Sequence, residues 1–136
     1  MKKNLILVFA LLLVFTAGCS ASAPAADTEK SSQTFRQISQ EEAKEMMAKD
    51  DGHVVVDVRR QDEYDAGHIP GAILVPNESI GCDSPEALPD FDQIILIYCR
   101  TGNRSKQAAQ KLASMGYTNI YEFGGITTWI GDVVTD

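Results

Sequence analysis

The chain has 136 residues, of which 44% are hydrophobic, and a formal net charge of −7. This length and composition suit one globular domain and exclude a largely disordered chain or one with several membrane spans. The acidic balance argues against nucleic acid as a partner, because nucleic-acid-binding proteins usually present a broad basic face to the phosphates.

The N-terminal segment has the pattern of an export signal. Two lysines precede the eleven apolar residues from Leu5 to Phe15, a run too short to cross a bilayer comfortably as a permanent helix. Gly18-Cys19, directly behind this run, resembles the lipobox of bacterial lipoproteins, in which the signal is cut before a cysteine that carries a lipid. The match departs from that pattern at Thr16, where Leu is usual.

We therefore expect a signal peptide over 1–18, a flexible, lipid-anchored tether over 19–33 and a folded domain over 34–136. The expected location is outside the cytoplasm, with the protein anchored through Cys19 to a membrane and facing the periplasm or the cell exterior. Plain secretion after cleavage near Ala23, or an uncleaved anchor, is the alternative.

Apolar periodicity and turn residues predict alternating helices and strands from Phe35 onward. Ser39 and Glu42 have the spacing of a capping box at a helix start. The expected helices cover 40–50, 61–66, 103–115 and 126–130, and the expected strands cover 53–58, 73–75, 93–98 and 119–122, with a loop over 76–89. This alternation indicates an α/β fold with a mainly parallel sheet that is covered on both faces.

The most informative stretch is the apolar strand 94–98, which leads directly to Cys99, a glycine-containing turn and a helix start. Backbone N–H groups and the positive end of the helix dipole converge at such a place and stabilise a thiolate. Residues 93–121 include four basic residues and no acidic one, which favours anion binding in an acidic chain. Cys99 is therefore a candidate nucleophile, and the alternative is a buried, inert thiol.

Three motifs, in this order, resemble those of the single-domain rhodaneses. They are Val56-Asp57-Val58-Arg59, then Gly67-His68-Ile69-Pro70-Gly71-Ala72, then Tyr98 with Cys99 and the residues as far as Ser105. The resemblance implies one rhodanese-like domain with a five-stranded sheet flanked by helices on both faces. It also implies a sulfurtransferase that needs no cofactor, in which Cys99 takes a sulfane sulfur from thiosulfate or a persulfide and passes it to cyanide or a thiol. The substrate loop would comprise Arg100, Thr101, Gly102, Asn103, Arg104 and Ser105.

Two other functions remain open from the sequence. A non-catalytic persulfide carrier, or a binding module for a partner protein, would use the same cysteine without multiple turnover. Related folds that act as phosphatases or arsenate reductases have five residues between Cys and Arg, whereas four separate Cys99 from Arg104. The shorter ring of amides favours one terminal sulfur over a tetrahedral oxyanion.

Other residues are assigned supporting roles. We expect Arg59 and Glu63, four positions apart, to form an ion pair beside the site. Asp57 should accept hydrogen bonds at a strand end. His68 should be a hydrogen-bonded turn residue, because it lacks the neighbours of a metal site, and no metal is expected.

Three further side chains have two interpretations each. Arg100 points either into solvent or toward an anionic sulfur donor. Trp129 packs on the core or lines the substrate pocket. Cys82 is either a resolving thiol for Cys99 or an incidental surface cysteine.

Overall fold

The protein is described by a computed structural model that covers residues 35–135. The expected signal peptide, the tether and the lipid attachment at Cys19 lie outside these residues. Within the described part of the chain, no helix has the length and apolarity needed to cross a membrane.

Five strands form one sheet in the order β1-β5-β4-β2-β3, and every neighbouring pair is parallel. The strands are β1 (Arg36–Gln37), β2 (Val54–Asp57), β3 (Ile73–Leu74), β4 (Ile94–Cys99) and β5 (Asn119–Gly125). The helices are α1 (Gln40–Met47), α2 (Gln61–Asp65) and α3 (Asn103–Met115), with 3-10 turns η1 (Asn77–Ser79) and η2 (Ile126–Thr128). The expected α/β fold with a five-stranded sheet is therefore confirmed.

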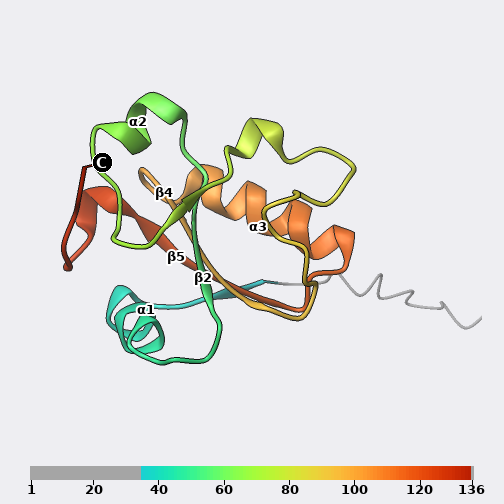
Figure 1. Ribbon diagram of the computed structural model, residues 1–136, viewed down its shortest axis with the longest axis horizontal. Helices are drawn as coiled ribbons and strands as arrows, with labels where there is room; N and C mark the ends of the chain where they lie inside the picture. Colours follow the sequence, from blue (N-terminus) through green and yellow to red (C-terminus); the bar gives the residue numbers. More distant parts are fainter. Residues whose placement is uncertain (1–34, 136) are drawn as a thin grey trace, which may run out of the picture.

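The sheet lies between two helical layers, with α1 on one face and α3 on the other (Figure 1). Alternate residues of β4 point to opposite faces, as the pleat of a strand requires. Ile95 and Ile97 pack in the cluster that contains the apolar side of α3, whereas Leu96 and Tyr98 pack with Ala43 of α1. β4 is thus buried on both faces, and its last residue, Cys99, lies buried at the carboxyl end of the sheet.

A side-chain cap accounts for the start of α1 at Gln40. The side chain of Ser39 accepts a hydrogen bond from the N–H of Glu42 at 3.1 Å, which confirms the expected cap of α1.

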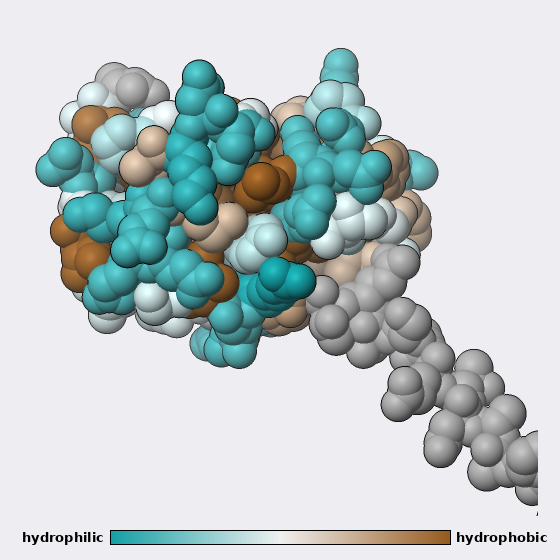
Figure 2. Space-filling model, turned by 90° about the horizontal axis from the view of Figure 1, so that it is seen from below, coloured by the Kyte–Doolittle hydropathy of each residue, from teal (hydrophilic) through white to brown (hydrophobic). Residues whose placement is uncertain are grey.

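Acidic and lysine side chains cover the outer face of α1. Figure 2 views the molecule from the α1 side and shows a mostly hydrophilic face, on which apolar atoms form small, separate patches.

Most expected boundaries agree with the structure to within one residue, but α1 ends at Met47 rather than at 50, and β1, β5 and the last helix also differ from the expectation. The edge strand β1 had no assigned position, because its two exposed residues show no apolar alternation; its pairing partner, Tyr121 on β5, is far away in the sequence. β5 continues to Gly125 rather than ending at 122, and the expected last helix is a single 3-10 turn. Because β5 continues to Gly125, it lies directly beside Cys99, which pairs with Gly125 in the register.

Candidate active site

Cys99 lies at the junction of β4 and the loop that precedes α3. Its side chain is 1% exposed, and its Sγ accepts a hydrogen bond from the backbone N–H of Gly102 at 3.0 Å. Burial raises the pKa of the thiol, but hydrogen bonds from the Ser105 side chain and from the amides of Ser105, Gly102 and Thr101 outweigh burial. The pKa of Cys99 therefore lies below its ordinary value, as a nucleophilic thiol requires.

The loop adopts its shape because two glycines allow it. Gly102, at the N-cap of α3, has a φ of +102°, a left-handed conformation that side chains rarely adopt. A Cβ on Gly125 would stand 2.1 Å from the carbonyl oxygen of Arg100, so β5 contacts the loop through bare backbone. Thr127 donates to the same oxygen from its N–H at 3.3 Å and its hydroxyl at 3.0 Å. Contacts with Gly125 and Thr127 therefore hold the backbone of the loop at Arg100.

Arg104 and Glu63 form a two-pronged ion pair at the edge of the site. The two terminal nitrogens of Arg104 donate to the two carboxylate oxygens of Glu63 at 2.6 and 2.7 Å. These hydrogen bonds, assisted by the charge of Arg104, lower the pKa of Glu63 to about 2 despite partial burial. The expected pairing of Arg59 with Glu63 is wrong. Arg59 precedes α2, so the spacing that favours a helical pair does not apply to it.

Arg59 instead belongs to a buried network behind the site. Its Nη2 lies 2.6 Å from Asp57 Oδ2 and also donates to the carbonyl of Gly67 at 2.7 Å. The hydroxyl of Tyr98 donates to Asp57 at 2.7 Å and accepts from the N–H of Ile69 at 3.1 Å. Asp57 thus accepts hydrogen bonds at the end of β2, as expected, and the network joins β2 and β4 to the turn that follows α2.

A family model described as a rhodanese-like domain matches residues 39–132. The chain belongs to this family. A thiosulfate sulfurtransferase GlpE of Pseudomonas entomophila is 40% identical over 96 residues, which cover 70% of this chain and 84% of the relative. One from Pseudoalteromonas translucida is 38% identical over 96 residues, which cover 70% of this chain and 89% of that protein.

Solved structures agree with this assignment. A rhodanese with anions from E. coli has 31% identity and a TM-score of 0.57, over 62% of this chain and 99% of that one. A rhodanese-like domain protein from Staphylococcus aureus has 28% identity and a TM-score of 0.63, over 75% of this chain and 99% of that one.

The remaining loop residues of this rhodanese-like domain divide by exposure. Arg100, Thr101 and Asn103 are exposed at the surface, whereas Gly102 and Ser105 are buried beneath it. The two buried residues support Cys99 through hydrogen bonds to its sulfur. Exposure leaves both interpretations of Arg100 open.

His68 is hydrogen-bonded in its turn, as expected, and Trp129 packs against the core, the first of the two interpretations given for it. His68 stacks on the Tyr64 ring at 3.7 Å between centroids, and its Nδ1 lies 3.0 Å from the carbonyl oxygen of Tyr64. Trp129 packs on Phe123 at 5.4 Å and donates from its indole N–H to the carbonyl of Asp132 at 3.1 Å. Within residues 35–135, no group of three or more His, Cys, Asp or Glu side chains is placed to hold a metal ion.

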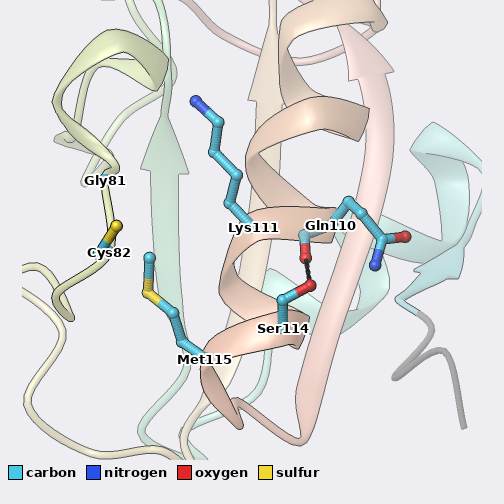
Figure 3. A pocket seen from close by; sticks show the side chains of 6 residues that line it. All are labelled: Gly81, Cys82, Gln110, Lys111, Ser114 and Met115. Carbon is cyan, nitrogen blue, oxygen red and sulfur yellow. Dashed lines mark hydrogen bonds between the residues drawn. The ribbon is translucent and has the colours of Figure 1, made fainter. Parts of the chain in front are cut away.

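Cys82 is a free, exposed thiol in the loop that follows η1. It lines a hollow of about 340 Å³ with side chains from the second half of α3 (Figure 3). Figure 3 shows it opposite Met115 and Lys111, which lie two or more turns of α3 beyond the end that contacts Cys99. The structure therefore does not bring Cys82 next to Cys99, and its role as a resolving thiol stays a prediction.

Sequence reasoning missed Glu122 of β5. This carboxylate is 2% exposed and lies beneath the cysteine loop, where Oε1 accepts from the Ser105 hydroxyl at 2.6 Å and from the Gly124 N–H at 2.9 Å. The one available signal was an acidic residue between the core residues Ile120 and Phe123. In a strand such a residue is usually exposed, and only the packing of α3 and β1 onto β5 buries it.

Proposed function

We propose that this protein is a thiosulfate sulfurtransferase in which Cys99 is the nucleophile and the sulfur carrier. The observation that carries the proposal is a buried thiol at the end of β4, just before α3, whose sulfur accepts a hydrogen bond from the Gly102 N–H at 3.0 Å and whose pKa is lowered. The names of the relatives, both thiosulfate sulfurtransferases, support the same substrate class.

The first half-reaction is an attack of the Cys99 thiolate on the outer sulfur of thiosulfate. A bond forms between Sγ and that sulfur, while the sulfur–sulfur bond of thiosulfate breaks and its electron pair leaves with sulfite. The outer sulfur of the resulting persulfide is an anion, which the amides of the loop and the N-terminus of α3 stabilise. Arg104 adds positive charge at the same place, because its guanidinium interacts electrostatically with Cys99.

The second half-reaction returns the cysteine to its starting state. Cyanide, or the thiolate of a small thiol, attacks the outer sulfur of the persulfide, and the Sγ–sulfur bond breaks with its electron pair left on Cys99. Thiocyanate or a new persulfide is released. The two steps together consume no oxidant or reductant beyond the donor and the acceptor, and they use no cofactor.

Steady-state turnover of thiosulfate with cyanide tests this function and separates it from a persulfide carrier. We expect repeated formation of thiocyanate by the wild type and by Cys82→Ser, and none by Cys99→Ser, because an alcohol at neutral pH is neither ionised nor able to hold a sulfane sulfur. A single equivalent of transferred sulfur, with no further turnover, would favour the carrier. Retained turnover in Cys99→Ser would exclude the mechanism.

We further propose that the protein is exported and anchored to a membrane through a lipid on Cys19. The support is the sequence pattern alone: an apolar segment of eleven residues followed by Gly18-Cys19. A diacyl modification supplies two chains, enough for stable anchoring. We expect the full-length protein to incorporate a palmitate analogue and to enter the detergent phase, and Cys19→Ala to do neither. An unlabelled wild-type protein in the aqueous phase would contradict the anchor.

A further inference from the structure

Thr127 contacts the cysteine loop from outside it, although the mechanism above gives this residue no task. Its backbone N–H and its hydroxyl both donate to the carbonyl oxygen of Arg100, at 3.3 and 3.0 Å. A carbonyl oxygen has two lone pairs, so the two donors use its full capacity and set its direction. Thr127 lies in η2, directly after β5, and is not part of the loop between Cys99 and α3.

Gly125 holds the peptide unit between Arg100 and Thr101 from another side. A Cβ on Gly125 would stand 2.5 Å from the carbonyl carbon of Arg100 and 2.6 Å from the Cα of Thr101, so the bare backbone of β5 lies against this unit. Within residues 35–135 every peptide bond is trans. In a planar, trans unit the N–H points opposite to the carbonyl, so a held Arg100 carbonyl also sets the direction of the Thr101 N–H.

The next peptide unit carries the N–H that reaches the sulfur. Gly102 donates from its N–H to Cys99 Sγ at 3.0 Å. The unit after that is held by α3, because the carbonyl of Gly102 accepts from the N–H of Lys106 at 3.2 Å. The donor to the sulfur therefore lies between two peptide units that are each held in place, one by Thr127 and one by the first turn of α3.

Contacts with α1 hold η2 in turn. The side-chain amide of Gln40, the first residue of α1, donates to the carbonyl of Gly125 at 3.0 Å and to the hydroxyl oxygen of Thr128 at 2.9 Å. The chain is thus tied to α1 on both sides of Thr127. Thr127 itself is exposed, so a change of its side chain disturbs no core packing.

We propose that Thr127 is a positioning residue for sulfur transfer, which holds the Arg100 carbonyl so that the amides of the loop face the sulfur of Cys99. The negative charge of the thiolate, and later of the persulfide, is stabilised best by N–H donors that are already oriented. Hydrogen bonds that a carbonyl accepts also polarise its peptide unit and strengthen the bond donated by the N–H of that unit. The inference rests on the proposed function, because it assigns the task of Thr127 to that reaction.

The charged groups near Cys99 are independent of Thr127. Arg104 interacts with Cys99 and with the carboxylates of Glu63 and Glu78, and Glu122 lies buried beneath the loop. Both hydrogen bonds that Thr127 donates go to the Arg100 carbonyl instead. Loss of the Thr127 hydroxyl therefore changes the loop backbone and leaves these charges in place.

The pKa of Cys99 is consistent with this role. Burial raises it, whereas hydrogen bonds from Ser105 and from the amides of Gly102 and Thr101 lower it. Two of these amides belong to the stretch of backbone that Thr127 holds. The thiol of Cys99 therefore reports on the orientation of the loop.

The pH dependence of Cys99 alkylation by iodoacetamide tests the role of Thr127 without any sulfur donor. Only the thiolate reacts, and every variant carries Cys82→Ser so that a single thiol is followed. Thr127→Val removes the hydroxyl but keeps the shape, so we expect the midpoint of the profile to rise by about half a pH unit. Alkylation below the midpoint should be about 3-fold slower, whereas the plateau at high pH, where the thiol is fully ionised, should not change. Thr127→Ser keeps the donor and should keep the original midpoint.

Thr118 provides a matched control at the opposite end of β5. It is also exposed, its N–H donates to the carbonyl of Phe91 at 3.0 Å, and its hydroxyl donates to the carboxylate of Asp92 at 2.8 Å. Thr118→Val loses a hydroxyl hydrogen bond of its own but should leave the midpoint of Cys99 unchanged. Below the midpoint, kcat/KM for thiosulfate should fall by about 3-fold in Thr127→Val and not in Thr118→Val.

Three results of the alkylation experiment would overturn the proposal: an unchanged midpoint in Thr127→Val, an equal shift in Thr127→Ser, or an equal shift in Thr118→Val. If Thr127→Val does not fold, which thermal unfolding would show, Thr127→Ala removes the same hydroxyl and is judged by the same outcomes. Failure of the proposed function is seen separately, because wild-type protein that forms no persulfide with thiosulfate refutes the sulfurtransferase activity whatever the alkylation profile shows.

Discussion

The guanidinium of Arg104 donates from both terminal nitrogens to both oxygens of Glu63, at 2.6 and 2.7 Å. The pair connects α2 to the first turn of α3 and fixes the position of a positive charge that acts on Cys99. A planar, two-pronged contact of this kind orients the guanidinium in a way that a single hydrogen bond cannot.

Glu63→Gln should therefore lower kcat/KM for thiosulfate by about 10-fold, equivalent to about 1.4 kcal/mol of transition-state stabilisation, because Arg104 loses its charged partner and its fixed orientation. Asp65→Asn is the matched control: it changes an exposed carboxylate of the same helix, which contacts Gln61. The role of the pair would be refuted by equal kinetics in wild type and Glu63→Gln.

The same pair predicts a dependence of stability on pH. Arg104 lowers the pKa of Glu63 from 4.5 to about 2, so the folded state binds the proton of this group less readily than the unfolded state does. The stability that the ionised Glu63 contributes is complete above about pH 4.5 and is lost as the pH falls toward 2. In urea unfolding, the difference in free energy between wild type and Glu63→Gln should shrink over this interval. A difference that stays constant or grows toward low pH would contradict the assignment.

Two adjacent arginines allow the contribution of a buried ion pair to stability to be compared with that of an exposed one. Arg59 is 5% exposed and paired with the fully buried Asp57, whereas the side chain of Arg60 is 66% exposed and lies 3.3 Å from Asp62. Arg59→Met leaves a buried carboxylate without its partner and should reduce the free energy of unfolding by about 3–5 kcal/mol. Arg60→Met should cost less than about 1 kcal/mol. Equal losses in denaturant unfolding would show that the Asp57 network does not hold the fold together.

The order of elements and the position of the nucleophile could be predicted from local sequence. A continuous β-branched run, a capping box at Ser39 and a glycine turn before α3 are short-range signals, and they placed the strands and helices around Cys99. Partners of charged groups are long-range properties. The spacing of Arg59 and Glu63 favoured a local pair, whereas Glu63 binds a residue 41 positions away. Glu122 escaped prediction for the same reason, because its burial depends on packing between elements that are distant in the sequence.

The close approach of β5 to the cysteine loop depends on Gly125. A methyl group there would stand 2.1 Å from the carbonyl oxygen of Arg100, and that backbone atom has to move to make room. Gly125→Ala should therefore shift the loop and lower both the thermal midpoint and turnover. Gly81→Ala is the control, because a Cβ at this exposed position meets nothing within 4 Å and its backbone is not left-handed. Unchanged turnover in Gly125→Ala would mean that the loop tolerates displacement.

The mass of the intact protein after incubation with thiosulfate tests the central claim most directly, because it detects the sulfur on the cysteine itself. We expect wild type and Cys82→Ser each to gain one sulfur atom, to lose it on addition of cyanide, and to carry it on the peptide that contains Cys99. Cys99→Ser should gain none. Sulfur found on Cys82 alone, or an unchanged mass in folded wild-type protein, would contradict the account.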